Sequence, residues 1–338
     1  MLDQAFVEAQ CRRIGVTRIA DLTGLDIIGI PVMQAVRPAS KSISVSLGKG
    51  LDANAARLSA LGEAYELFCA EELVGAVTAW PLGPGPPVEI AAERVSMDLT
   101  RLTDENRNAG GLSATGLASH PSARHAVRHG LYECLERHLY SLWVGMPAHS
   151  RLALLVDLKT VDDQLCSTLA HRLLDLGFSM LIWDLAKDMA VSSYLVEVFE
   201  PQPIAGSLVS YSQGLACAAK PASALRAAIL EAIQTRLAYI SGAREDLTAY
   251  DFFGRLRDMA ADRCALQARH RPARRFGACA PGRHGGARLR GVLASLGLGV
   301  PLAADLTPPD WPATAVKVIL PGALDLLGEE RGSTCAAH

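Results

Sequence analysis

Ser59-Ala60-Leu61-Gly62-Glu63-Ala64-Tyr65-Glu66 is the first of three copies of one pattern in this chain. The other two copies are Gly130-Leu131-Tyr132-Glu133-Cys134-Leu135-Glu136-Arg137 and Ala228-Ile229-Leu230-Glu231-Ala232-Ile233-Gln234. In each copy a glycine-rich turn precedes an alanine-rich segment with helical spacing, which carries an acid or amide pair three residues apart. Five carboxylates and one amide therefore stand where apolar helix positions would be expected, which is costly unless cations meet them.

Small residues precede each acid pair at the same distances. Three residues before the leading Glu stand Ala60, Gly130 and Ala228, and seven residues before it stand Ala56, Ala126 and Ala224. The second and third copies also share Gly-Leu-Ala, at 116–118 and 214–216, with seventeen residues from that glycine to the Glu in both. Because residues three apart share one helix face, each pair points the same way, and the small residues allow other backbone to approach that face closely.

The composition excludes several classes of protein. The 338 residues are 50% apolar and 5% aromatic, and the net charge of −2 gives no case for nucleic-acid or membrane-surface binding. The eight cysteines are scattered without a C-x-x-C pair, which argues against a zinc knuckle and predicts a cytoplasmic protein with free thiols. The N-terminus lacks the regions of a signal peptide, and no apolar run reaches the roughly 20 residues of a membrane span.

Periodicity predicts a mixed α/β (α+β) fold. The acid pairs fall on helices expected over 53–70, 122–142 and 222–240. Further helices are expected over 161–176 and 251–266, a loop over 81–87, and strands over 27–32, 43–45, 152–156, 179–183 and 192–198. A weaker internal similarity relates Trp183-Asp184-Leu185-Ala186 to Ala304-Asp305-Leu306-Thr307, each expected to lead from one strand into the next. Repeated units interleaved in this way indicate one domain with internal pseudo-symmetry.

The segment 263–290 differs from its surroundings because it holds eight arginines and no acidic residue. Its simplest interpretation is a basic loop. The alternative is a patch, including Arg274 and Arg275, that meets an acidic peptide or a partner protein.

The chemistry of the repeated acids favours a magnesium-nucleotide site. If the three helices converge, mutual repulsion raises the pKa values of Glu63, Glu66, Glu133, Glu136 and Glu231 unless cations neutralise them. Oxygen ligands without imidazole or thiolate suit Mg²⁺, which commonly bridges to phosphates. Lys49 in Ser46-Leu47-Gly48-Lys49-Gly50 and Arg137 after Glu136 supply cations for phosphate oxygens, although Gly-Lys-Gly is not a Walker A loop.

These residues resemble the YcaO family, ATP-dependent enzymes that modify peptide backbones. The resemblance runs from about Gly15 to Gly322. It is carried by the acid pairs, by Val36-Arg37-Pro38, by Gln234-x-Arg236 followed by Gly242-Ala243-Arg244, and by Val316-Lys317-Val318 before Pro321-Gly322. The resemblance implies a single YcaO-type domain over 14–325, with a short segment 1–13 before it and a tail 326–338 after it.

By the same resemblance, Ser59, Glu63 and Glu66 fall on the family's first nucleotide and Mg²⁺ motif. Glu133, Glu136 and Arg137 fall on the second, with Glu136 and Arg137 as the catalytic candidates, and Glu231 and Gln234 fall on the third. Two phosphate contacts are in doubt, because Leu67 and Ala227 stand where the family often has arginine, with Arg226 one place earlier.

The family's chemistry implies ATP and Mg²⁺ as cofactors and a peptide or protein as substrate. A side-chain nucleophile gives an azoline, external sulfide gives a thioamide and an amine gives an amidine. The chain lacks the proline-rich tail common in azoline-forming members. The segment 34–50 and the compact length look closer to members that form thioamides with a TfuA partner. A homodimer is also implied. The alternatives are an azoline-forming cyclodehydratase and, from another class, a non-catalytic scaffold of a peptide-modifying complex.

Overall fold

The structure is a computed structural model of the whole chain that describes residues 10–101, 113–243, 248, 254–272, 274–277 and 286–325, without the side chains of 286–288. The predicted segment 1–13 is therefore described only from residue 10, and the predicted tail 326–338 lies outside the described residues. The described part contains no helix with the length and apolarity needed to cross a bilayer.

The described residues form three antiparallel sheets, each with one edge strand that leads into a helix with an acid or amide pair. The first sheet has the order β1 (Arg18–Asp21), β2 (Val32–Val36), β3 (Val45–Lys49), and β3 leads into α2 (Ala53–Glu71). The third has the order β7 (Ser179–Asp184), β8 (Ser192–Phe199), β9 (Tyr211–Ala218), and β9 leads into α7 (Pro221–Ile240).

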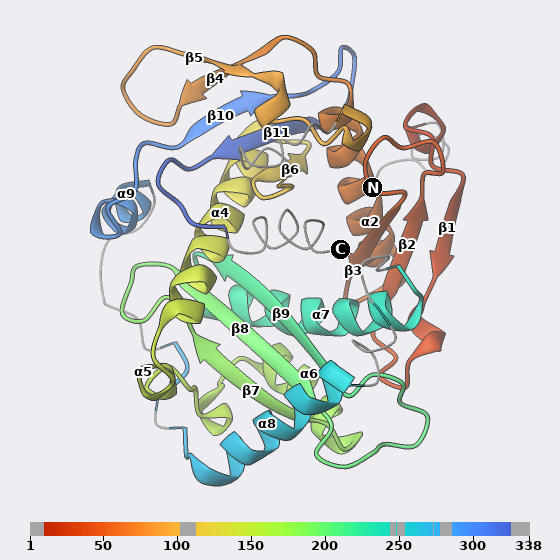
Figure 1. Cartoon of the computed structure of the whole chain (residues 1–338), viewed down its shortest axis with the longest axis vertical. Coiled ribbons are helices and arrows are strands. Elements are labelled where there is room, and N and C mark those ends of the chain that lie inside the picture. The colour runs from red at the N-terminus through yellow and green to blue at the C-terminus, as the bar shows by residue number, and fades with distance from the viewer. Residues whose placement is uncertain are drawn as a thin grey trace.

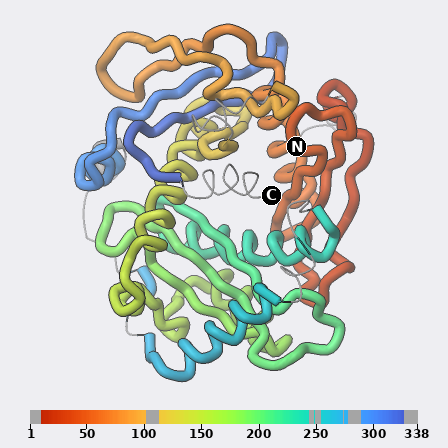
Figure 2. The backbone as a smooth tube through the Cα atoms, viewed as in Figure 1, coloured from red at the N-terminus to blue at the C-terminus, as the bar shows by residue number. Residues whose placement is uncertain are grey.

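The second sheet joins segments from far apart in the chain. Its order is β5 (Val88–Ala91), β4 (Ala76–Pro81), β10 (Leu302–Asp305), β11 (Thr314–Ile319), β6 (Leu117–His120), and β6 leads into α4 (Ala123–Gly145). Figure 2 shows this as the orange hairpin lying beside the blue strands. Further helices are α5 (Ala148–Leu152), α6 (Gln164–Asp175), α8 (Leu256–Arg269) and α9 (Gly286–Ser295), with short 3-10 turns at Thr23–Leu25, Ala92–Arg94, Leu99–Arg101 and Leu158–Thr160.

The three repeated helices lie around the middle of the molecule, with the sheets outside them (Figure 1). Each helix packs on the edge strand of its own unit and also on that of the next unit: α2 on β3 and β6, α4 on β6 and β9, and α7 on β9 and β3. The units are therefore interlocked in a ring, and the predicted pseudo-symmetry is confirmed.

The small residues of the repeat permit this packing. Ala56, Ala60, Ala224 and Ala228 are completely buried. A Cβ placed on Gly48 would lie 2.0 Å from the backbone nitrogen of Ala60, and one on Gly214 would lie 2.2 Å from the carbonyl oxygen of Ala228. In the second unit a Cβ on Gly130 would lie 2.6 Å from the carbonyl oxygen of Gly116. The close approach predicted from the sequence is confirmed in all three units.

Most of the expected elements are present, and the exceptions have local causes. The strand expected over 27–32 is wrong, since β2 begins only at Val32, after Gly29 with φ +67° and Pro31, which has no N–H to donate. The strand expected over 152–156 is also wrong: α5 ends at Leu152, and Leu155 and Val156 form isolated bridges to Trp183 and Arg274. The similarity around the two Asp-Leu sequences is confirmed, because β7–β8 and β10–β11 are both antiparallel pairs.

We expect Gly214→Ala to destabilise the protein by about 2–3 kcal/mol, because the added methyl group would force β9 away from the α7 backbone. Gly291→Ala is the matched control, since a Cβ there meets nothing within 4 Å and alanine favours a helix. Urea unfolding of both variants measures the difference. Equal stability of the two would contradict the close-packing account.

Candidate functional site

The leading Glu of the first two units accepts a hydrogen bond from the backbone of the segment that precedes its helix. Leu47 N on β3 donates to Glu63 Oε2 at 3.0 Å, and Gly116 N, directly before β6, donates to Glu133 Oε2 at 3.0 Å. In the third unit the backbone of Leu215 on β9 acts to lower the pKa of Glu231. The leading carboxylates of the first two units are therefore held against the backbone in the same way.

Cations connect the units at this place. Lys49 Nζ on β3 lies 2.8 Å from Glu231 Oε2 on α7, although 182 residues separate them in the chain. Arg137 lies 3.5 Å from Glu136 and 3.9 Å from Glu133, and its own pKa is raised by Glu136, Glu133 and Glu231 despite its burial. Lys49 and Arg137 thus link the acid pairs into one electrostatic network.

Burial dominates the behaviour of most of these acids. Desolvation raises the pKa of Glu63 to about 7, against the opposing effect of its bond to Leu47. Desolvation also raises the pKa of Glu66 to about 8 and that of Glu136 to about 8, and the negative charge of Glu133 adds to both. The pKa of Glu133 is raised in the same direction by burial. Burial alone would raise the pKa of Glu231 too, but the charges of Lys49 and Arg137 outweigh burial. The pKa of Glu231 therefore lies below that of an ordinary glutamate.

The other two predicted residues lie on the same helices. Ser59 is exposed on α2, one turn before Glu63, and Gln234 is half-buried on α7, one turn after Glu231. The roles assigned to Ser59 and Gln234 therefore stay predictions.

Two arginines from the motifs that carry the family resemblance form buried ion pairs within the fold. Arg236 is completely buried and its Nε lies 2.9 Å from Asp26 Oδ2. Arg37 is buried beside Glu71, with Nη2 and Oε2 at 2.6 Å. Leu67, which stands where the family often has arginine, is a core residue with 3% of its surface exposed. Arg244 lies outside the described residues.

The basic segment 263–290 is only partly described, but two of its arginines also serve the fold. Arg263 Nε lies 2.7 Å from Glu197 Oε1, which is completely buried, and Arg274 Nε lies 2.6 Å from Asp184 Oδ2. The interpretation of Arg274 as part of a free basic patch is therefore wrong, because its guanidinium is needed to neutralise buried Asp184. Arg275 is exposed.

The sequence interpretation gave no site role to two residues that interact with the acid pairs, Ser119 by hydrogen bonds and Lys317 by its charge. Ser119 donates its backbone N–H and hydroxyl to Glu66 Oε1, at 2.7 Å and 2.9 Å. Lys317 is buried on β11, where desolvation lowers its pKa and the charges of Glu133 and Asp325 oppose that shift. A signal existed for both: Ser119 directly follows the repeated Gly-Leu-Ala, and Lys317 is a single charge within an apolar strand.

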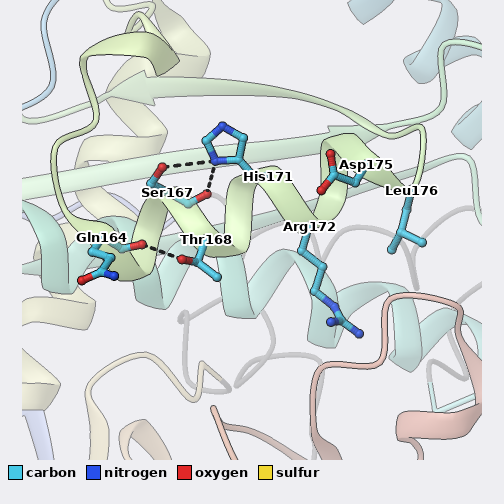
Figure 3. A pocket seen from close by; sticks show the side chains of 7 residues that line it. All are labelled: Gln164, Ser167, Thr168, His171, Arg172, Asp175 and Leu176. Carbon is cyan, nitrogen blue, oxygen red and sulfur yellow. Dashed lines mark hydrogen bonds between the residues drawn. The ribbon is translucent and has the colours of Figure 1, made fainter.

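The open pocket of about 620 Å³ shown in Figure 3 is not this site. It lies along α6, where Ser167 and His171 bond one another within the helix, and none of the nine predicted residues lines it.

The donor set fits Mg²⁺ and a nucleotide. Carboxylate oxygens are the ligands that Mg²⁺ prefers, and the Lys49 ammonium and Arg137 guanidinium suit phosphate oxygens. Among the described residues, no three His, Cys, Asp or Glu side chains lie close enough together to hold one ion. An ion that keeps several waters and bridges to phosphate needs no such cage. The acids act on one another electrostatically without forming one ligand set, and their role as metal ligands stays a prediction.

A protein-family model matches residues 70–324, and its description is "YcaO cyclodehydratase, ATP- and Mg²⁺-binding". The chain belongs to the YcaO family. ATP and Mg²⁺, the predicted cofactors, are confirmed at the level of this family. The match begins after Glu63 and Glu66, so the first acid pair lies outside it.

Two relatives have not been characterised. One is described as an "uncharacterized protein in tfuA 3' region" of Rhizobium leguminosarum bv. trifolii, 27% identical over 96% of this chain and 88% of the relative. The other is an uncharacterized protein of Methanothermobacter thermautotrophicus, 30% identical over 72% of this chain and 70% of its own length.

Two solved structures share the fold. The structure described as YcaO from Methanopyrus kandleri bound with AMPPCP and Mg²⁺ superposes with a TM-score of 0.71 at 19% identity, over 96% of this chain and 91% of that one. A structure described as a heterocyclase in complex with substrate and cofactor also superposes with a TM-score of 0.71, at 16% identity over 94% of this chain and 52% of that one. Both superpositions confirm the mixed α/β YcaO fold.

The raised pKa values predict that the ligand-free protein loses stability as the pH rises. Glu63, Glu66 and Glu136 bind their protons more tightly in the folded protein than in the unfolded chain. Their contribution to the free energy of unfolding is therefore complete below pH 4.5, the ordinary pKa of glutamate, and is lost as the pH rises to about 7 to 8. We expect Tm without Mg²⁺ or nucleotide to fall between about pH 4.5 and 8, and Glu66→Gln to reduce that fall. Glu72→Gln, 62% exposed at the end of α2, is the control. An identical pH dependence in all three proteins would contradict the prediction.

Proposed function

We propose that this protein uses ATP and Mg²⁺ to activate a backbone amide of a ribosomally made peptide or protein, and that the product is a thioamide formed with a TfuA-like partner. The observation that carries the first part is the convergence of three acid-bearing helices, linked by Lys49 and Arg137 into one network. The second part is supported by the relative described as lying in a tfuA 3' region.

Each residue has a proposed task that follows from its chemistry. Glu63, Glu66, Glu133, Glu136 and Glu231 offer oxygens to Mg²⁺, and Lys49 neutralises phosphate oxygens. Ser59 and Gln234 contact the nucleotide from the same helix faces. Bound Mg-ATP supplies the phosphoryl group that turns the amide oxygen into a leaving group. Glu136 and Arg137 are the proposed catalytic pair. Of the three repeated motifs, only the second has an arginine directly after its acid pair, and a guanidinium suits phosphate oxygens.

The second candidate is an azoline-forming cyclodehydratase, which the description of the matching family favours. The two reactions share the activated amide and differ in the nucleophile, which is external sulfide for the thioamide and a Cys, Ser or Thr of the substrate for the azoline. Action as a homodimer in the cytoplasm is part of either proposal.

Mass spectrometry separates the two reactions. A candidate peptide is incubated with ATP, sulfide and the purified protein, with and without the TfuA-like partner. We expect a mass gain equal to the difference between sulfur and oxygen that depends on the partner. Loss of one water without sulfur gain would show the azoline reaction instead, and an unchanged peptide under every condition would count against both.

We also expect Glu63→Gln and Glu136→Gln to abolish binding of Mg-ATP while leaving the fold intact, because the amide keeps the shape of the side chain and removes its charge. Calorimetric titration with Mg-ATP measures the affinity, and circular dichroism checks the fold. Glu72→Gln, outside the network, should bind as the wild type does. Affinity like that of the wild type in both site variants would refute the site.

A further inference from the structure

One position recurs beside the acid pairs, and two of its three residues, Ser119 and Cys217, have no role in the assignment above. It lies fourteen residues before each leading Glu and is Lys49 before Glu63, Ser119 before Glu133 and Cys217 before Glu231 (63 − 49, 133 − 119 and 231 − 217). All three residues lie on the edge strands β3, β6 and β9.

The contacts at this position run between neighbouring units. Ser119 on β6 donates two hydrogen bonds to Glu66 on α2, at 2.7 Å and 2.9 Å. Lys49 on β3 lies 2.8 Å from Glu231 on α7. Cys217 is half-buried on β9, which packs against α4, the helix that carries Glu136. In two units the repeated position therefore contacts an acid of another unit, and in the third it lies on the strand that packs against the next acid-bearing helix.

The three side chains differ in what they offer that acid pair. Lys49 brings a full positive charge, Ser119 brings a hydroxyl that donates a good hydrogen bond, and Cys217 brings only a weak S–H donor. The serine hydroxyl and the backbone N–H of the same residue both donate to Oε1 of Glu66, which holds that oxygen against β6.

We propose that this repeated position sets the orientation of the acid pairs across the ring, and that Ser119 is the positioning residue for Glu66 and Cys217 its weaker equivalent for Glu136. The inference rests on the proposed function, since it concerns how firmly these carboxylates are held for Mg²⁺ and the nucleotide.

The test uses the full chain and a fluorescent ATP analogue with Mg²⁺. We expect Ser119→Ala to weaken binding by about tenfold or more, the effect of one hydrogen bond to a charged group, and Ser119→Thr to restore it. A threonine keeps the hydroxyl, and Gly62, which lies across from Ser119 Oγ, presents no side chain to obstruct it. Cys217→Ala should change binding less than about twofold, because a thiol donates weakly. Wild-type affinity of Ser119→Ala, or no recovery with threonine, would overturn the proposal.

A second measurement needs no nucleotide. A double-mutant cycle of Glu66→Ala and Ser119→Ala in thermal unfolding of the ligand-free protein should show non-additive effects, because the two side chains are in contact. Failure of the wild type to bind the analogue would refute the proposed function, while the cycle would still decide whether Ser119 holds Glu66. Additive effects in the cycle would refute the positioning role alone.

Discussion

The close contact between each edge strand and its helix is the constraint on which the site depends. Only where Gly48, Gly214 and the pair Gly116 and Gly130 remove side chains can the strand backbone come near enough to donate an N–H to a glutamate on the helix. The same contact helps to bury the glutamates, and burial is the largest cause of the raised pKa values of Glu63 and Glu133. The close approach of strand to helix therefore determines both how the units pack and how readily these glutamates ionise.

The ring arrangement makes the three units depend on one another. Each helix packs on two edge strands, and Lys49 and Ser119 each carry a contact from one unit to another. Charge repulsion among five buried or half-buried carboxylates would otherwise separate the helices. Lys49 and Arg137 oppose it directly, and protonation of Glu66 and Glu136 near neutral pH opposes it further.

Arginine has two separate uses in this structure. Arg236, Arg37, Arg263 and Arg274 each neutralise an acid in the interior of the fold, while Arg137 lies within the network of acid pairs. A guanidinium that leaves such a buried pair exposes an uncompensated charge, so these pairs hold their elements in place. The sequence shows only that each of these residues is an arginine, which does not distinguish an arginine in a buried ion pair from one that would contact phosphate.

The sequence by itself determined the repeated helices and the chemistry of their acid faces, because spacing of three along a helix and small residues one and two turns earlier are local properties. It also indicated the cofactors and the family. It did not determine that Lys49 pairs with Glu231, that Ser119 holds Glu66, or that Arg236 and Arg274 turn inward. Those contacts join residues from 53 to 210 positions apart, and only the packing of the ring decides which strand faces which helix.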